Sequence, residues 1–232
     1  PIIWHLMRYY AHFGHHEFIL CLGYGGEMIR EYFLNYSECE SNDFTLSEGG
    51  RRIEPHRRDI EDWRITFVDT GLHANVGERL VAVREFVEDD DVFLANYSDG
   101  LSDLDLDAHV DSIVQAGAVA GFAAVRPQHS LHCVSVDDGE RVVEIVPMDR
   151  SEIRVNGGFF AFRREIFDHI EAGEELVEAP FRRLIDKRRL VAKHHDGFWA
   201  AMDTFKDKIR FDRMYARRER PWELWNRRSA GS

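Results

Sequence analysis

The feature that most constrains this chain is an alternation of short apolar runs with amphipathic segments through its first half. Apolar runs bounded by turn residues are typical of buried strands, and apolar residues at helical spacing are typical of helices. Strands that alternate with helices form a mainly parallel sheet with helices on both faces. The sequence therefore predicts an α/β fold, with strands in 17–26, 63–71, 92–100 and 118–127 and helices in 1–14, 27–36, 77–87 and 106–117.

The second half adds an antiparallel feature to this pattern. Residues 132–147 contain two apolar runs on either side of Asp138-Gly139, which is a strong signal for a β-hairpin. A strand with a glycine pair follows, then two helical segments, a strand that opens a loop at 190–204, and a final amphipathic helix. Because no linker, repeat or low-complexity tract interrupts the chain, we predict a single domain over residues 1–232.

Composition excludes several classes of function. The net charge of −12 argues against a nucleic acid or an anionic membrane as the main partner. The cysteines Cys21, Cys39 and Cys133 are widely spaced, which indicates free thiols in a reducing compartment. No stretch approaches the roughly 20 apolar residues of a membrane span, and no signal peptide opens the chain. We therefore expect a cytoplasmic protein.

The stretch "VFLANYSDGLSDLD" places an acid, Asp99, at the end of an apparently buried strand. In an open α/β sheet, ligands bind beyond the carboxyl ends of the strands, and Gly100 behind the acid would let a ligand approach closely. The simpler interpretation is a turn, because Asp-Gly is a common turn pair. Taken alone, the turn is favoured.

A second acid, Asp203, follows an apolar and aromatic run and precedes the last helix. Taken alone it is best interpreted as a helix cap, where Asp is a preferred residue. If the two acids converge, however, they can hold one Mg²⁺, which takes one or two carboxylates and completes its shell with phosphate and water. Such a site is typical of phosphoryl or nucleotidyl transfer.

Two further segments carry candidate binding residues. Gly157 and Gly158 inside a strand predict either a plain bulge or a close backbone approach, and Asn156 offers a donor and an acceptor to a hydroxyl-rich ligand. Thr70 lies in a polar loop after a strand, and Arg79 could contact a phosphate or could be an ordinary solvated charge. The histidines have no zinc-site spacing, so we interpret them as packing or surface residues.

Taken in order, these stretches resemble the glucose-1-phosphate cytidylyltransferases, which belong to the sugar-phosphate nucleotidyltransferases. The resemblance runs from Pro1 to Trp225. It implies a Rossmann-like mixed sheet with a small antiparallel insertion, and a reaction in which CTP and glucose 1-phosphate give CDP-glucose and pyrophosphate for polysaccharide or deoxysugar synthesis. The stretches that carry it are "PIIWHLMRYYAHFGHHEFILCLGYGGEMIREYFLNY", "ITFVDTG", "GERL", "FLANYSDGLSDLD", "VNGGFFAF", "GFWAAMDTFKDK" and "PWELW".

The resemblance also implies roles for single residues. Asp99 and Asp203 match the two aspartates that hold Mg²⁺, and Arg79 and Ser98 match positions that contact the nucleotide. Gly157 and its neighbours match the strand on the sugar side, with Asn156 as a sugar contact. The family commonly forms oligomers, and we expect a homo-oligomer here, with Trp222 and Trp225 as exposed aromatic residues at a subunit contact.

Two departures from the family pattern put the activity of this chain in question. The family opens with a strand and a glycine-rich loop of the GGxGTR kind, which this sequence lacks. We expect that on the order of thirty residues, about one strand–loop–helix unit, are missing, that a sheet edge is left unpaired, and that this chain alone is inactive.

The second departure lies after the predicted hairpin. Val146 stands where the family has a lysine that meets the sugar phosphate, and Arg126, Arg150 or Arg154 could supply that charge instead. Two alternatives therefore remain. The enzyme could use another sugar phosphate or nucleotide, or the domain could be catalytically inactive and bind a nucleotide-sugar or regulate a partner.

Overall fold

The computed structural model describes residues 1–128 and 131–226 and builds the chain around two separate sheets. The first is a parallel pair, β1 (Glu17–Leu22) and β4 (Arg64–Asp69), in which Glu17 lies opposite Arg64 and Leu22 opposite Asp69. Three helices precede or connect these strands: α1 (Ile2–His12), α2 (Gly26–Leu34) and the short α3 (Glu38–Ser41).

The second sheet has five strands and is mixed. In it β12 runs parallel to β7, while β11 runs antiparallel to both β5 and β7, and β10 pairs with the far end of β7. The prediction of a mixed α/β fold is confirmed, although in this sheet only the β7–β12 pair is parallel and the other pairs are antiparallel. The strands are β5 (Val92–Ala95), β7 (Ala120–Val125), β10 (Val155–Asn156), β11 (Phe160–Arg163) and β12 (Leu190–His195).

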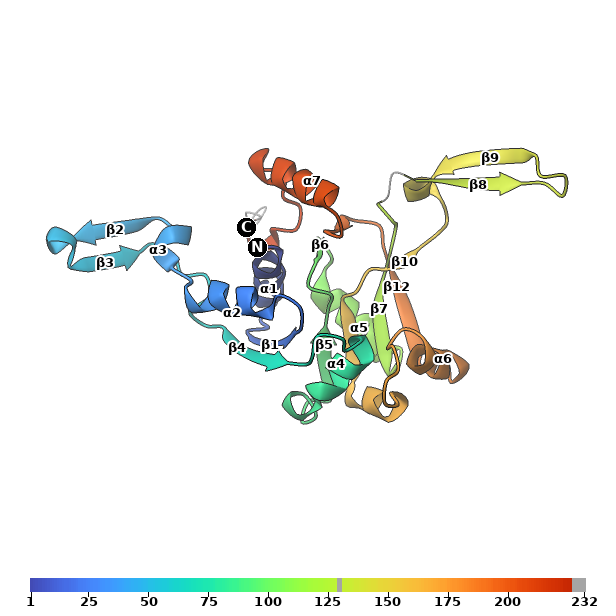
Figure 1. The fold of residues 1–232 in the computed structure, drawn as a ribbon, viewed down its shortest axis with the longest axis horizontal. Helices are drawn as coiled ribbons and strands as arrows, with labels where there is room; N and C mark the ends of the chain where they lie inside the picture. Colours follow the sequence, from blue (N-terminus) through green and yellow to red (C-terminus); the bar gives the residue numbers. More distant parts are fainter. Residues whose placement is uncertain (129–130, 227–232) are drawn as a thin grey trace.

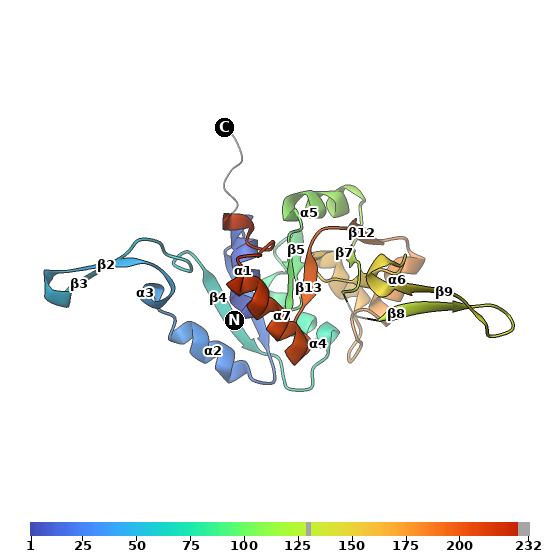
Figure 2. The same cartoon turned by 90° about the horizontal axis from the view of Figure 1, so that it is seen from above.

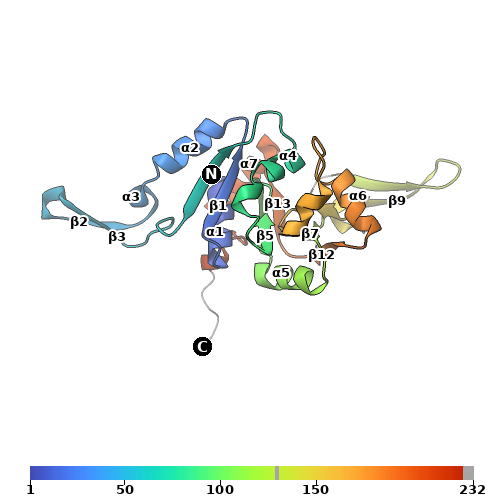
Figure 3. The same cartoon turned by 90° about the horizontal axis from the view of Figure 1, so that it is seen from below.

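Helices cover both faces of this sheet, as the alternation in the sequence predicts (Figure 3). Successive residues of a strand point to opposite faces, so Ala123 and Val125 of β7 pack with α1 and α5 (Leu106–Gln115). Ala120 and Phe122 pack on the other side, with α4 (Val76–Ala82) and α6 (Ala179–Asp186). The five-stranded sheet is therefore the centre of the hydrophobic core.

The two sheets are not joined by hydrogen bonds in the described part of the chain. There β1 pairs only with β4, and β5 pairs only with β11. Each of these two strands therefore has one edge without a strand partner among the described residues. Within the described residues no helix is both long and apolar enough to cross a membrane.

Two hairpins extend from opposite ends of the molecule (Figures 1 and 2). One is β2 (Phe44–Ser47) with β3 (Arg52–Pro55). The other is β8 (His132–Val136) with β9 (Val142–Pro147), the predicted antiparallel insertion. Its turn is fixed by the Asp137 carboxylate, which accepts hydrogen bonds from the amides of Gly139 and Arg141. This confirms the predicted hairpin.

Two segments differ from their predicted form. The strand expected through Gly100 ends at Ala95, and a separate strand β6 (Gly100–Ser102) pairs with β13 (Trp199–Ala201), where only a loop was expected. The first of the two helical segments expected after the strand with the glycine pair is a 3-10 helix, Arg164–His169. The final helix, α7 (Phe205–Ala216), is present as predicted.

The prediction that Trp222 and Trp225 are exposed is wrong. Trp222 is 2% exposed and packs its ring against Phe198 and Phe211. Trp225 is partly buried and makes an edge-on contact with Trp4 of α1. The chain after α7 therefore closes over the first helix, and these aromatic rings provide no outward surface for a subunit contact. The three cysteines are free thiols, as predicted.

Candidate active site

The short ladder between β6 and β13 brings Asp99 and Asp203 together. Ala201 lies opposite Gly100 in this antiparallel pair, and the amide of Met202 donates a hydrogen bond of 2.9 Å to the carbonyl of Asp99. Asp99 ends the chain segment that leads into β6, and Asp203 follows the end of β13. The two acids thus lie together at one point of the fold, which is the convergence that the sequence left open.

The electrostatics of the pair fit a bound cation. Burial raises the pKa of Asp99 because it disfavours the charged form, and the carboxylate of Asp203 raises it further because it disfavours a second negative charge nearby. A divalent cation would remove this cost, and two carboxylates are a sufficient protein donor set for Mg²⁺. Across residues 1–128 and 131–226, no group of three or more His, Cys, Asp and Glu side chains is arranged to hold a metal.

Asp203 is not the cap of the last helix, so that simpler interpretation is wrong. Thr204 is the N-cap of α7: its hydroxyl oxygen accepts a hydrogen bond from the amide of Asp207, and the Asp207 carboxylate accepts one from the amide of Thr204. This reciprocal capping box satisfies the start of the helix. The exposed carboxylate of Asp203 therefore has no capping role.

A compact polar cluster fixes the register of the same ladder. Asp103 Oδ1 accepts a hydrogen bond of 2.7 Å from the amide of Phe198 and lies 3.1 Å from His195 Nε2. Ser102 Oγ donates to the carbonyl of Phe198 at 2.8 Å. A slip of one residue in a strand moves its side chains to the opposite face. The cluster thus holds Asp203 on the side of Asp99, a role that the sequence analysis did not assign to His195.

The glycine pair makes a close backbone approach, which is one of the two predicted alternatives. Gly158 has φ +77°, and a Cβ there would overlap Asn96 Oδ1. Asn156 Oδ1 accepts a hydrogen bond from the amide of Gly158, and Asn156 Nδ2 donates to Tyr97 Oη at 3.2 Å. Val125 packs directly against Gly157. A Cβ on Gly157 would stand only 2.7 Å from Val125 Cγ1. The predicted sugar-side residues are therefore packed beside the segment that leads to Asp99.

Two of the three predicted nucleotide-side residues, Thr70 and Arg79, meet at the carboxyl ends of β1 and β4. Arg79 Nη1 donates a hydrogen bond of 2.7 Å to Thr70 Oγ1, and the amide of Thr70 donates to the carbonyl of Leu22 at 3.0 Å. The guanidinium also lies over Gly23, where a Cβ would stand 2.7 Å from Nη2. Ser98 is exposed in the turn between β5 and β6, directly before Asp99.

A loop that precedes α6 positions the helix that carries Arg79. Arg183 makes two hydrogen bonds of 2.6 Å to the carboxylate of Glu174, which lowers the pKa of Glu174 to about 2. The carbonyl of Glu174 lies against Gly77, leaving no room for a Cβ. Glu175 accepts a hydrogen bond of 3.2 Å from the amide of Val76 at the start of α4. None of these contacts has a signal in the sequence, because the partners are distant along the chain.

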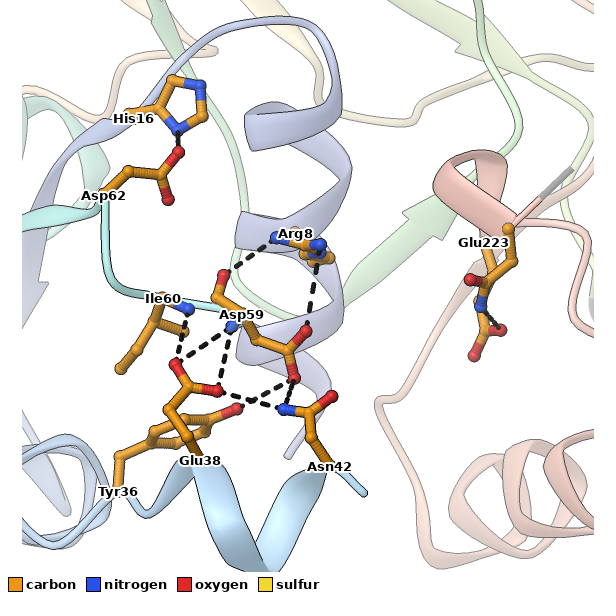
Figure 4. Close-up of polar contacts among 10 residues, drawn as sticks. Arg8, His16, Tyr36, Glu38, Asn42, Asp59, Ile60, Asp62 and Glu223 are labelled. Atoms are coloured by element: carbon orange, nitrogen blue, oxygen red, sulfur yellow. Dashed lines mark hydrogen bonds and ion pairs between the residues drawn. The ribbon is translucent and has the colours of Figure 1, made fainter. Parts of the chain in front are cut away.

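A separate polar network lies at the base of the β2–β3 hairpin (Figure 4). The Glu38 carboxylate accepts hydrogen bonds from the amides of Asp59 and Ile60. Arg8 of α1 donates to the carbonyl of Asp59 at 2.8 Å, and Asn42 Nδ2 donates to Asp59 Oδ2 at 2.8 Å. This network ties the hairpin to the first helix and contains none of the candidate site residues.

Curated relatives, and not a family model, place the chain in a family. No family model matches it. The glucose-1-phosphate cytidylyltransferases of Salmonella typhi and Salmonella typhimurium are each 35% identical to it over 227 residues, which is 97% of this chain and 88% of each relative. A relative from Bacillus subtilis is 33% identical over 228 residues, with the same coverage.

Solved structures agree with the fold. A UDP-glucose pyrophosphorylase complexed with UDP-glucose superposes with a TM-score of 0.64 at 13% identity, over 94% of this chain and 87% of that one. HddC from Yersinia pseudotuberculosis superposes with a TM-score of 0.58 at 13% identity, over 93% and 85%. These likenesses show the architecture, and the identity to the Salmonella proteins shows the family. The chain belongs to the glucose-1-phosphate cytidylyltransferase family.

Proposed function

We propose that this protein joins a nucleoside triphosphate to a sugar 1-phosphate and releases pyrophosphate, with CTP and glucose 1-phosphate as the favoured pair. The observation that carries the proposal is the meeting of Asp99 and Asp203 at the end of the β6–β13 ladder. Asp203 is not needed as a helix cap, because α7 has its own, and two adjacent carboxylates repel each other. A cation that binds between the two carboxylates, beside substrate phosphates, would offset this repulsion.

Mg²⁺ is the cation that we assign to this pair. When bound it supplies charge neutralisation to phosphate oxygens at the reacting centre. Asp99 and Asp203 are the side chains that would hold it. The half-buried position of Asp99 limits access of bulk water, which strengthens electrostatic interactions at this point.

The remaining residues bind and orient the two substrates. In the proposed reaction a phosphate oxygen of the sugar 1-phosphate forms a bond to the α-phosphorus of the nucleotide, and the bond to pyrophosphate breaks. Arg79, with Thr70 beside it, contacts the nucleotide phosphates, and Ser98 offers a hydroxyl next to Asp99. Asn156 and the glycine backbone contact the sugar hydroxyls. Catalysis is then positioning plus charge stabilisation, without a covalent intermediate on the protein.

The setting of this activity is part of the proposal. CDP-glucose made here would supply polysaccharide or deoxysugar synthesis in the cytoplasm, and the protein would work as a homo-oligomer. The net charge of −12 disfavours nucleic acid and anionic membranes as partners. Small phosphorylated substrates remain compatible with it, because a local cluster of basic residues is enough to bind them.

Pyrophosphate release tests the proposal directly. Protein expressed from its complete gene is incubated with Mg²⁺ and glucose 1-phosphate in the presence of CTP, UTP, ATP, GTP or dTTP. We expect release with CTP that depends on both Mg²⁺ and glucose 1-phosphate. Release with another nucleotide would keep the reaction class and change the specificity. Silence with all five, repeated with other sugar 1-phosphates, would contradict the proposal and favour an inactive domain that binds a nucleotide-sugar.

A further inference from the structure

Two arginines and one aspartate meet at the ligand-binding edge of the five-stranded sheet. In the β7–β10 ladder Val125 lies opposite Val155, so Arg126 and Arg154 are the next facing pair. In the β7–β12 ladder Val125 lies opposite His195, so Asp196 is the next residue on the other side of Arg126. The backbone register alone therefore brings these three charges together at the end of β7.

The three side chains contact one another directly, but they differ in how much of each is exposed to solvent. Asp196 Oδ1 lies 2.7 Å from Arg154 Nη2 and 3.2 Å from Arg126 Nε. Arg154 is only 18% exposed, and its Nη1 also donates to the carbonyl of His195 at 3.3 Å. The Asp196 side chain is 64% exposed. The cation is thus held inside the fold, while the carboxylate that meets it can move into water.

The charges of the cluster do not balance. Two guanidinium groups face one carboxylate, and both lower the pKa of Asp196 by stabilising its ionised form. Arginine presents paired donors that match phosphate as well as carboxylate. A phosphate dianion would satisfy both arginines more completely than the single carboxylate does. In a chain of net charge −12, this local excess of positive charge can attract an anion.

The cluster is connected to the candidate active site along one strand. Arg154 and Asn156 are two residues apart, so they project from the same face of the strand. Asn156 contacts the hydroxyl of Tyr97, and the charge of Asp99 acts on Tyr97. Because β5 and β7 are both antiparallel to β11, their carboxyl ends lie at the same edge of the sheet, which is where ligands of such sheets bind.

We propose that Arg126 and Arg154 bind the phosphate of the sugar 1-phosphate, and that Asp196 occupies this anion site in the free protein and is displaced by the substrate. The inference rests on the proposed function. It also explains how the chain can do without a lysine at Val146. Of the three arginines that the sequence offered, Arg150 is exposed on the 3-10 helix after β9, whereas the other two converge.

Calorimetric titration tests the assignment without requiring turnover. Protein from the complete gene is titrated with glucose 1-phosphate, with glucose and with CTP. Asp196→Asn should tighten glucose 1-phosphate binding several-fold, because a competing anion is removed. Arg154→Met should weaken it by about tenfold or more, the loss expected for a charged hydrogen bond. Arg150→Met is the matched control and should change nothing. Binding of glucose and CTP should be unaffected by all three substitutions.

The outcomes separate this inference from the proposed function. If Asp196→Asn and Arg154→Met, both folded by circular dichroism, leave glucose 1-phosphate affinity unchanged, the cluster is a structural clamp and the inference is wrong. This holds even if the enzyme is active. If Arg154→Met does not fold, Asp196→Asn alone decides. If the titration gives the expected order but no nucleotide yields pyrophosphate, the anion site stands and the proposed reaction fails. If the substitutions change the affinity for CTP and not that for glucose 1-phosphate, the site binds the nucleotide and the inference is wrong.

Discussion

The two halves of the candidate site are built in different ways. The half with Asp99, Asp203 and the glycine pair lies on the five-stranded sheet and the β6–β13 ladder, where close backbone contacts fix each residue. The half with Thr70 and Arg79 lies on a sheet of two strands and is held by side-chain hydrogen bonds. The first half is positioned by backbone packing, while the second is positioned by side-chain hydrogen bonds.

This difference suggests a division of labour. Transfer of a nucleotidyl group needs charges at fixed positions, since small displacements at the reacting centre are costly. Binding of a flexible triphosphate depends less on the exact position of one arginine. We therefore expect substitutions in the carboxylate half to act on turnover, and substitutions in the Thr70–Arg79 half to act on nucleotide affinity.

The largest effect should follow from Asp99→Asn. This change keeps the shape of the side chain and removes the charge that would hold Mg²⁺, so kcat should fall by about a hundredfold to a thousandfold, as when other main electrostatic stabilisers are removed. Steady-state pyrophosphate release measures it, and circular dichroism confirms the fold. Wild-type turnover in a folded variant would return Asp99 to the role of a turn residue.

Gly158→Ala should also cause a large loss of stability. Its comparison with Gly71→Ala tests how tightly the backbone is packed in each half. At Gly158 a side chain meets both a positive φ and Asn96, whereas at Gly71 φ is +96° and there is open space. Backbone strain alone costs about 1–3 kcal/mol, so Gly71→Ala measures strain without a clash. Urea unfolding should show a larger loss for Gly158→Ala. Equal losses would mean that the carboxylate half is no more tightly packed than the other.

Arg79→Gln should have a smaller effect, and on a different quantity. We expect the KM for CTP to rise about tenfold, the loss expected for one charged hydrogen bond, with kcat changed little. Arg84→Gln is the control, because that exposed arginine pairs with Glu88 outside the site. A fall in kcat with an unchanged KM would place Arg79 in the reacting centre and remove the division of labour.

The smallest effect concerns stability and pH. Burial and Asp203 raise the pKa of Asp99 in the folded protein above its unfolded value of about 3.9. Without Mg²⁺ the fold should therefore lose stability as pH rises from about 4 through this raised pKa, and Asp99→Asn should abolish that part of the dependence. Added Mg²⁺ should raise the Tm of the wild type more at pH 7 than at pH 5. The same Mg²⁺ shift in Asp99→Asn would show that the metal binds elsewhere.

The sequence predicted the features that local chemistry determines. Alternating strands and helices gave the sheet with two covered faces, and Asp138-Gly139 gave the β8–β9 hairpin, because periodicity and turn residues act within a few positions. The strand-end acids were found for the same reason: a charge after a buried run is visible in the sequence.

Features that depend on distant partners were not visible. The strand β13 has only three residues and exists because β6 lies beside it, and Trp222 is buried because α1 and α7 enclose it. The roles of His195, Glu174 and Arg183 likewise depend on contacts between segments far apart in the chain. The cap of α7 was misplaced by one residue, because Asp203 and Thr204 are both good capping residues.

The most direct test of this account is the pyrophosphate-release rate and the thermal stability of Asp203→Asn, measured on the same protein. Since Thr204 caps α7, the account predicts an unchanged or slightly higher Tm together with a loss of turnover comparable to that of Asp99→Asn. A lowered Tm with turnover near the wild-type rate would contradict it, because Asp203 would then support the helix and not the reacting phosphates.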